Sequence, residues 1–171
     1  WYHDAIDYVL ANGLMNGYGN GKFGPMDNLS RAMLAQILYN MEKKPAVELP
    51  AGQFPDVSAG SWYTDAVYWA KANGIVDGYS DGRFAPDDSI TREQLVTMLW
   101  RYAKYKGQDV SAAADLSAYQ DGAQVSAYAA PAMQWACGTG VVQGSNGKLM
   151  PADTATRAEV AQILQNFVSE K

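Results

Sequence analysis

Three arginines in matching sequence contexts are the residues of this chain best suited to chemistry. They lie in the segments Ser30-Arg31-Ala32-Met33, Thr91-Arg92-Glu93-Gln94 and Thr156-Arg157-Ala158-Glu159. A Ser or Thr followed three residues later by Gln or Glu predicts a helix N-cap of the capping-box type, here Thr91 with Gln94 and Thr156 with Glu159. The cap does not account for the arginine, because a cation in the first turn faces the positive end of the helix dipole.

Each arginine therefore needs a negatively charged partner, and the sequence leaves two sources open. One source is a carboxylate from a neighbouring part of the chain, and the other is an external ligand that carries a carboxylate or phosphate. A guanidinium beside the free N–H groups of a helix N-terminus could cradle either group. We therefore take Arg31, Arg92 and Arg157 as candidate ligand-binding residues.

Glycine-rich loops and exposed aromatic residues extend this candidate site. The loops Gly17-Tyr18-Gly19-Asn20-Gly21 and Gly78-Tyr79-Ser80-Asp81-Gly82 offer close backbone approach and an aromatic face, although tight turns alone explain the glycines. Tyrosine and tryptophan suit sugar rings, because they join an apolar plane to a polar edge. We expect core packing for Phe23, Phe84, Trp69 and Trp135. The further candidates for ligand binding are Gly17, Tyr18, Gly78, Tyr79, Ser80, Asp81, Trp1 and Trp62.

The remaining reactive residues do not form a recognisable catalytic or metal site. His3 is the only histidine and Cys137 the only cysteine, so a zinc cluster of the Cys/His type is not expected. We expect His3 to be solvated and Cys137 to be packed. The acids of the second loop lack the order of an EF-hand, and no carboxylate pair stands out among the eighteen acids. We expect no metal and no cofactor.

The elements that must position these residues recur three times along the chain. Residues 1–31 match residues 62–92 at a constant offset of 61, and a third copy follows at an offset of 65 to 66. Each copy reads as helix, glycine-rich loop, helix. The first helix is predicted to stop at Gly13, Gly74 or Gly140. The second helix carries one apolar stripe per copy, namely Leu34, Ile37, Leu38 and Met41; Leu95, Met98, Leu99 and Tyr102; Val160, Ile163, Leu164 and Phe167.

This pattern predicts an all-α fold with three repeats, at residues 1–44, 54–106 and 117–171. No repeat has enough apolar stripe to stand alone, so the three must pack on one another as one domain. The linkers at 43–53 and 106–116 each lead into a short segment before the next repeat, and the first repeat lacks that segment. We therefore expect a mature product or a piece cut from a larger exported protein.

Composition narrows the class of protein. The 171 residues are 48% hydrophobic and 18% charged, which is typical of a globular chain, and the net charge of −5 with no basic run argues against nucleic-acid binding. No apolar run approaches the roughly 20 residues of a membrane helix, so membrane insertion is not expected.

The second copy in particular resembles the bacterial S-layer homology (SLH) repeat. The residues that carry the resemblance are Phe54, Asp56, Val57, Trp62, Ala66, Gly74-Ile75, Gly78-Tyr79, Asp81-Gly82, Phe84, Pro86 and Ile90-Thr91-Arg92-Glu93. The resemblance implies a pseudo-threefold helical domain around a central helical bundle, located at the extracellular cell surface. It also implies that grooves between repeats bind secondary cell-wall polysaccharide, commonly one ending in pyruvylated N-acetylmannosamine.

On this resemblance the family's ligand-binding arginine maps onto Arg31, Arg92 and Arg157. The first copy has Ser30, Met33 and Asn20 where Thr, Glu and Asp are usual, and the third copy lacks the loop Tyr and Asp. We therefore expect the three grooves to be unequal, with those of Arg92 and Arg31 dominant.

Three functional hypotheses follow. The first is a non-covalent cell-wall anchor without catalysis, which belongs to a larger exported protein. The second is a self-assembly module of a surface layer, in which the arginines pair with acids of a neighbouring protomer. The third is a carbohydrate-active enzyme, which would use acids scattered over the repeats.

Overall fold

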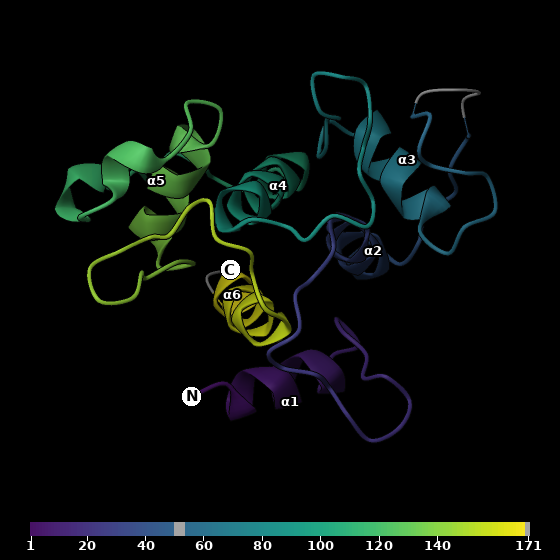
Figure 1. Cartoon of the computed structure of the whole chain (residues 1–171), viewed down its shortest axis with the longest axis horizontal. Coiled ribbons are helices and arrows are strands. Elements are labelled where there is room, and N and C mark those ends of the chain that lie inside the picture. Colours follow the sequence, from purple (N-terminus) through teal and green to yellow (C-terminus); the bar gives the residue numbers. More distant parts are fainter. Residues whose placement is uncertain (50–53, 170–171) are drawn as a thin grey trace.

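The computed structural model describes residues 1–49 and 54–169, and this part of the chain is helical (Figure 1). The predicted all-α class is confirmed: the described residues contain α-helices and short 3-10 helices, and only isolated bridge pairs in place of a sheet. The elements are α1 (His3–Ala11), α2 (Arg31–Met41), α3 (Thr64–Ala72), α4 (Arg92–Tyr105), η1 (Leu116–Ala118), η2 (Gly122–Gln124), α5 (Ala130–Thr139) and α6 (Arg157–Ser169).

The first helix of each repeat ends at the predicted glycine signal. In α1 the N–H of Leu14 donates to the carbonyl of Val9 at 2.8 Å, and the N–H of Gly13 donates to Leu10 at 3.1 Å. These two bonds form a Schellman motif, which needs a left-handed residue, and Gly13 has φ +66°. The same pair of bonds ends α3 around Gly74.

The second helices begin at the predicted caps. The hydroxyl of Thr91 accepts from the N–H of Gln94 at 3.3 Å, and the Gln94 side chain accepts from the N–H of Thr91 at 3.1 Å. This is the complete capping box that the sequence predicts for α4. In α6 the hydroxyl of Thr156 accepts from the N–H of Glu159 at 3.2 Å, which is one bond of the predicted box, and donates to the Glu159 carboxylate at 3.2 Å.

Helices pack in pairs that cross the repeat boundaries. The helix α3 packs on α2, α5 packs on α4, and α1 packs on α6, so each first helix lies against the second helix of the preceding repeat. Figure 1 shows α2, α4 and α6 towards the interior, with α1, α3 and α5 outside them. The predicted apolar stripes fill this interior: Leu34, Leu38, Leu95, Leu99, Val160 and Leu164 are buried.

Three backbone hydrogen bonds close the repeats into a ring. Leu29 donates to the carbonyl of Ala155 at 3.0 Å, Ala155 donates to Ile90 at 2.9 Å, and Ile90 donates to Leu29 at 2.8 Å. All three residues are completely buried. Each repeat thus bonds to both others at the centre of the molecule, whereas the pseudo-threefold symmetry of the repeats stays a prediction.

The predicted repeat boundaries also stay predictions. Part of the first predicted linker, residues 50–53 with Pro50, and the end of the third repeat, residues 170–171, lie outside the described residues. Among the helices that the structure describes, none has the length and apolar character needed to cross a bilayer.

Candidate ligand-binding grooves

Each of the three arginines begins a second helix and reaches into the glycine-rich loop of the next repeat. The Nε–H donates to a backbone carbonyl there: Arg31 to Phe84 at 2.9 Å, Arg92 to Leu149 at 2.8 Å and Arg157 to Phe23 at 2.9 Å. Arg31 and Arg157 are each only 6% exposed. The arginine therefore links consecutive repeats, and this structural role explains part of its recurrence.

The N–H groups at these helix starts are not free. The N–H of Arg31 donates to the carbonyl of Asp88 at 2.9 Å, and the N–H of Ala32 donates to Pro86 at 3.0 Å. The equivalent groups of α4 and α6 make the same kind of bonds to the repeat that follows each helix in the ring. The expectation that free helix N–H groups help to cradle an anion is therefore wrong, and the guanidinium remains as the candidate binding group.

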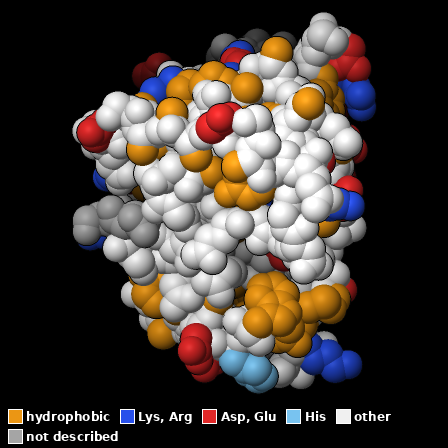
Figure 2. Space-filling model, turned by 90° about the vertical axis from the view of Figure 1, so that its left-hand side faces the viewer, with side chains coloured by type: hydrophobic (Ala, Val, Ile, Leu, Met, Phe, Trp, Pro, Cys, Tyr) orange, Lys and Arg blue, Asp and Glu red, His pale blue; other side chains and the backbone are white. Residues whose placement is uncertain are grey.

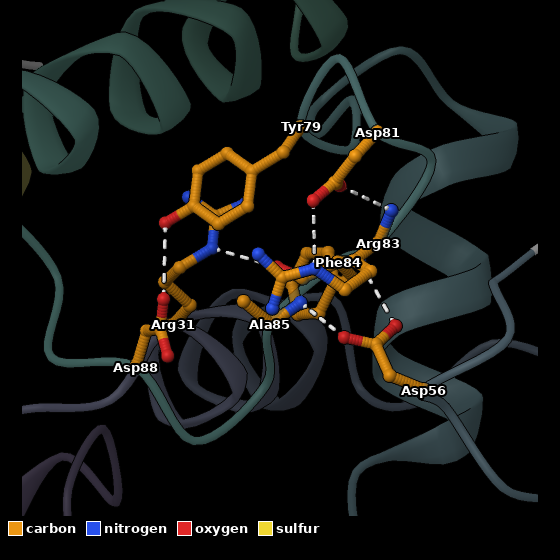
Figure 3. A network of polar contacts seen from close by, with 8 residues as sticks. All are labelled: Arg31, Asp56, Tyr79, Asp81, Arg83, Phe84, Ala85 and Asp88. Atoms are coloured by element: carbon orange, nitrogen blue, oxygen red, sulfur yellow. Dashed lines mark hydrogen bonds and ion pairs between the residues drawn. The ribbon is translucent and has the colours of Figure 1, made fainter.

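Two aromatic rings hold the guanidinium of Arg31. Its central carbon lies 4.7 Å from the centre of the Tyr79 ring and 4.9 Å from that of Phe84 (Figure 3). Burial lowers the pKa of Arg31 below its usual value, the main cause being loss of solvation. No described carboxylate forms an ion pair with this guanidinium.

Arg157 repeats this arrangement in the first repeat's loop. Its guanidinium carbon lies 4.8 Å from the centre of the Tyr18 ring and 4.6 Å from that of Phe23. One terminal nitrogen donates to the carbonyl of Asn16 at 2.5 Å. Among the described residues no carboxylate pairs with Arg157 either.

Arg92 differs, because a carboxylate takes the place of the rings. The third repeat has Leu149 and Ser145 where the others have Phe and Tyr. Nη1 of Arg92 instead lies 2.5 Å from the Glu159 carboxylate, in an ion pair whose side chains are 11% and 29% exposed. The sequence left open whether each arginine pairs with an internal carboxylate or with an external ligand. An internal carboxylate is present at one of them, Arg92.

Each arginine lies in the wall of a separate cavity. Groove A, of about 520 Å³, contains Arg31 and is lined by Ile75, Val76, Asp77, Gly78, Tyr79, Ser80, Gln94, Thr97, Met98, Arg101 and Tyr128. Groove B, of about 510 Å³, contains Arg92 and is lined by Trp1, Val141, Val142, Gln143, Gly144, Ser145, Met150, Glu159, Gln162, Ile163 and Asn166. Groove C, of about 210 Å³, contains Arg157 and is lined by Leu14, Met15, Asn16, Gly17, Tyr18, Leu29, Met33, Gln36, Ile37, Asn40 and Trp62.

All three repeats contribute to every groove. One repeat gives the arginine, the next gives the loop and second helix, and the remaining one gives an aromatic residue just before its first helix. These aromatic residues are Trp1 in groove B, Trp62 in groove C and Tyr128 in groove A, and they are 74%, 60% and 52% exposed. The grooves thus combine a desolvated cation with a solvent-exposed aromatic plane. On the face shown in Figure 2, orange hydrophobic side chains gather beside the only histidine, and the middle of the face carries little charge.

The chain matches a known family along most of its length. Residues 1–33, 53–96 and 118–161 each match the family described as S-layer homology domain. The chain belongs to the S-layer homology family. The three matched segments follow the three repeats, each ending within the second helix, and together cover more than half of the chain.

Relatives of this SLH chain are parts of much larger proteins. A surface-layer 125 kDa protein of Lysinibacillus sphaericus is 33% identical over 96% of this chain and 14% of its own length. An amylopullulanase of Thermoanaerobacterium thermosulfurigenes is 30% identical over 99% of this chain and 9% of its own length. A cellulosome-anchoring protein of Acetivibrio thermocellus is 30% identical over 55% of this chain and 22% of its own length. The chain thus spans less than a quarter of these relatives, and such SLH modules are located at the cell surface and cell wall.

Asp81 is the one predicted site residue that lies outside the groove linings. Its carboxylate accepts from Nε of Arg83 at 2.8 Å and from the Arg83 N–H at 3.0 Å, so it closes its own turn (Figure 3). The bond to Arg83 lowers the pKa of Asp81. The other candidates line the grooves as described, and their contact with a ligand stays a prediction.

Sequence analysis missed polar residues on the second helices. Gln36 and Asn40 line groove C and share a hydrogen bond of 2.9 Å, and Gln162 and Asn166 do the same in groove B. Amide groups at positions i and i+4 share one helix face, and each can donate to and accept from sugar hydroxyls. The recurrence of this pair at the repeat offset is a signal that could have identified it.

Sequence analysis also missed Tyr128 and the acid that holds its segment. The buried Glu93 carboxylate accepts from the N–H of Ser126 at 2.9 Å and from its hydroxyl at 2.7 Å. Burial, with Glu93 nearby, raises the pKa of Tyr128 to about 12, so its hydroxyl stays protonated. The other two repeats have alanine at the position of Glu93, so this link is specific to groove A.

The described residues offer no cluster of three or more metal-binding side chains. His3 is exposed, and Cys137 is half-buried near Tyr119. Burial raises the pKa of the Cys137 thiol, which disfavours its thiolate.

Proposed function

We propose that grooves A and C bind acidic groups of secondary cell-wall polysaccharide, so that the domain holds a larger exported protein to the wall without covalent attachment. This proposal rests on one observation, the surroundings of the Arg31 and Arg157 side chains. Each guanidinium is nearly buried, stacked on aromatic rings and without a carboxylate partner among the described residues. The coarser conclusion, cell-wall anchoring, has independent support from the SLH family match.

The chemistry of the groove favours a carboxylate on a sugar. An anion binds a buried guanidinium more strongly than an exposed one, because less water is present to screen the attraction between the two charges. Tyr79 keeps the plane of Arg31 fixed, and its own hydroxyl accepts from Gln94 at 3.3 Å. The exposed face of Tyr128 in the same groove suits the apolar face of a sugar ring. A pyruvyl ketal on N-acetylmannosamine, as the family resemblance implies, has both features.

We infer that the three grooves differ in their preference for acidic ligands. Sequence analysis favoured the grooves of Arg92 and Arg31. In groove B, however, Glu159 neutralises Arg92 at 2.5 Å, and an acidic ligand would have to displace or tolerate that carboxylate. We therefore place acid binding first in grooves A and C, which carry Arg31 and Arg157.

Equilibrium binding to purified wall polysaccharide, with and without its pyruvyl groups, tests this proposal. Loss of a charge-assisted hydrogen bond costs about 1.5–3 kcal/mol, so Arg31→Ala and Arg157→Ala should each weaken the affinity of one groove by roughly ten- to a hundredfold. Arg31→Lys is the matched variant that keeps the charge and loses the planar group. Equal binding to both polysaccharides, or retention by Arg31→Ala/Arg157→Ala at the level of the unaltered chain, would overturn the proposal.

The presence of more than one groove in each chain affects how long the domain stays bound to the wall. If two grooves engage sites on one polymer, the second contact forms at a high effective concentration and lengthens residence on the wall. The module needs no catalytic step for this role, and we assign none to it. The cargo that it attaches belongs to the part of the protein beyond this domain.

A further inference from the structure

Besides Arg31, groove A contains a second cationic side chain, that of Arg101. Arg101 of α4 lines this groove, and its Nη1 lies 2.9 Å from the carboxylate of Asp77. Nζ of Lys71 lies 3.8 Å from the other oxygen of the same carboxylate. Two cations therefore share one acid, and the cluster of Lys71, Asp77 and Arg101 has a net positive charge.

This cluster has no counterpart in grooves B and C. The residues at the position of Arg101 are Asn40 and Asn166, which line those grooves with uncharged amides. The residues at the position of Lys71 are Leu10 and Cys137. The chain thus offers natural neutral versions of the same site, which makes Asn the matched substitution for Arg101.

The charges around groove A leave the cluster able to receive an anion. Asp77 is the one acid in the lining of groove A, and its side chain is 64% exposed, so solvent screens its attraction for Arg101. The buried Glu93 is occupied by both donors of Ser126 and does not line the groove. The side chains of Arg101 and Lys71 are 26% and 36% exposed; Arg101 lines the groove, and Lys71 adjoins it through its ion pair with Asp77.

We propose that groove A binds a glycan segment with two anionic groups, one at Arg31 and a second, a phosphate or a carboxylate, at Arg101 and Lys71. This inference rests on the proposed function, because it assumes that Arg31 binds the first acid. It assigns to groove A a ligand class that grooves B and C, with amides at the same position, do not share. A guanidinium suits both kinds of anion, because its N–H groups can form paired bonds to two oxygens.

Two pairs of synthetic ligands test the inference by titration calorimetry with the whole chain. The first pair is the methyl glycoside and the anomeric phosphate of pyruvylated N-acetylmannosamine. The second pair is a disaccharide of the same sugar with glucuronic acid, as free acid and as methyl ester. For at least one pair, the ligand with the second charge should bind groove A about tenfold more tightly, and the pair that shows the gain identifies phosphate or carboxylate as the second group.

Substitutions assign the gain to the cluster. Arg101→Asn should remove the tenfold difference between the two ligands of a pair, and Asp77→Asn should enlarge that difference. Arg157→Ala, which alters groove C, should leave it intact. Thermal unfolding of Arg101→Asn and Arg101→Lys separates loss of the site from loss of the fold.

The outcomes separate this inference from the proposed function. If both ligands of each pair bind the unaltered chain equally, the second anionic site is excluded and the acid site at Arg31 stands. If the difference persists in Arg101→Asn or disappears in Arg157→Ala, the second anion does not bind at this cluster. If none of the four ligands binds, the proposed function fails first.

Discussion

Arg31 stacks on Tyr79 across a repeat boundary, with its guanidinium carbon 4.7 Å from the centre of the ring. The arginine begins α2 and the tyrosine lies in the loop of the following repeat, 48 residues later in the sequence. Arg157 and Tyr18 repeat this relationship at 4.8 Å, across the junction that closes the ring. The stack fixes the plane of the cation before any ligand arrives, which lowers the entropy cost of binding.

The stack predicts a difference between two substitutions of Tyr79. Tyr79→Leu removes the aromatic face, and a cation–π contact contributes about 0.5–2 kcal/mol, so binding to wall polysaccharide in groove A should weaken by roughly two- to thirtyfold. Tyr79→Phe keeps the face and loses only the hydroxyl bonds to Asp88 and Gln94. Calorimetric titration of both variants should therefore rank Phe close to the unaltered chain, and an equal loss in both would show that the hydroxyl is the binding group.

Groove B should gain acid binding when its internal acid is removed. Glu159→Gln removes the negative charge that pairs with Arg92 and keeps one side-chain oxygen and a similar volume. We expect the number of pyruvylated ligands bound per chain, measured by calorimetry, to rise by one. Because the pair is partly exposed, the free energy of unfolding should change by at most about 1 kcal/mol. An unchanged stoichiometry would mean that Glu159 does not block this groove.

Asp121 should control the stability of the third repeat's loop. Its carboxylate accepts from the N–H groups of Leu149 and Met150, both at 2.8 Å, and Met150 has a left-handed φ of +51°. Asp121→Asn replaces one acceptor by a donor, so urea unfolding at pH 7 should show a loss of about 1–3 kcal/mol. Asp81→Asn is the control, because the exposed Asp81 bonds only within its own turn and should leave the unfolding midpoint unchanged.

The same residue predicts an acid-dependent loss of stability. Burial alone would raise the pKa of Asp121, but the hydrogen bonds from Leu149 and Met150 outweigh it and lower that pKa. A lowered folded-state pKa stabilises the native state above the unfolded value of about 3.9, and this contribution disappears as the pH falls through the folded-state pKa. The difference in unfolding free energy between the unaltered chain and Asp121→Asn should therefore shrink below about pH 4. A difference that is constant from pH 7 to pH 2.5 contradicts this account.

Glu93 should act on groove A through Tyr128. Glu93→Ala removes the acceptor for both donors of Ser126, so the amides of residues 126–130 should exchange hydrogen faster and ligand affinity in groove A should fall by about threefold or more. The same substitution in a Tyr128→Ala background should have no further effect on affinity, because the residue through which it acts is gone. Additive losses would assign Glu93 a separate role in the fold.

The sequence predicted the local features of this fold well. The glycine stops at Gly13 and Gly74 and the capping box of Thr91 and Gln94 depend on residues only a few positions apart, and the structure confirms them. The internal repeat and its apolar stripes likewise predicted the all-α class.

Contacts between repeats could not be predicted in the same way. The N–H groups that begin α2 appeared available from the local sequence, and only the folded ring brings the carbonyls of Pro86 and Asp88 to them. Tyr128 also escaped notice, because it replaces a tryptophan and its groove is built mainly by the other two repeats. Asp81 matched the family pattern but is bonded to Arg83 in its own turn.

The hydrogen bonds among Leu29, Ile90 and Ala155 join the three repeats into a closed ring, so no repeat lies at the end of an open array. An open array of repeats can lose one end and keep its remaining binding surfaces, whereas here each surface draws on all three segments of the chain. Grooves B and C therefore stay unfinished until the last helix, α6, has docked against α1, whereas the lining of groove A comes from residues 31–128. These two grooves are thus completed only at the end of folding, and a copy that lacks α6 has neither of them.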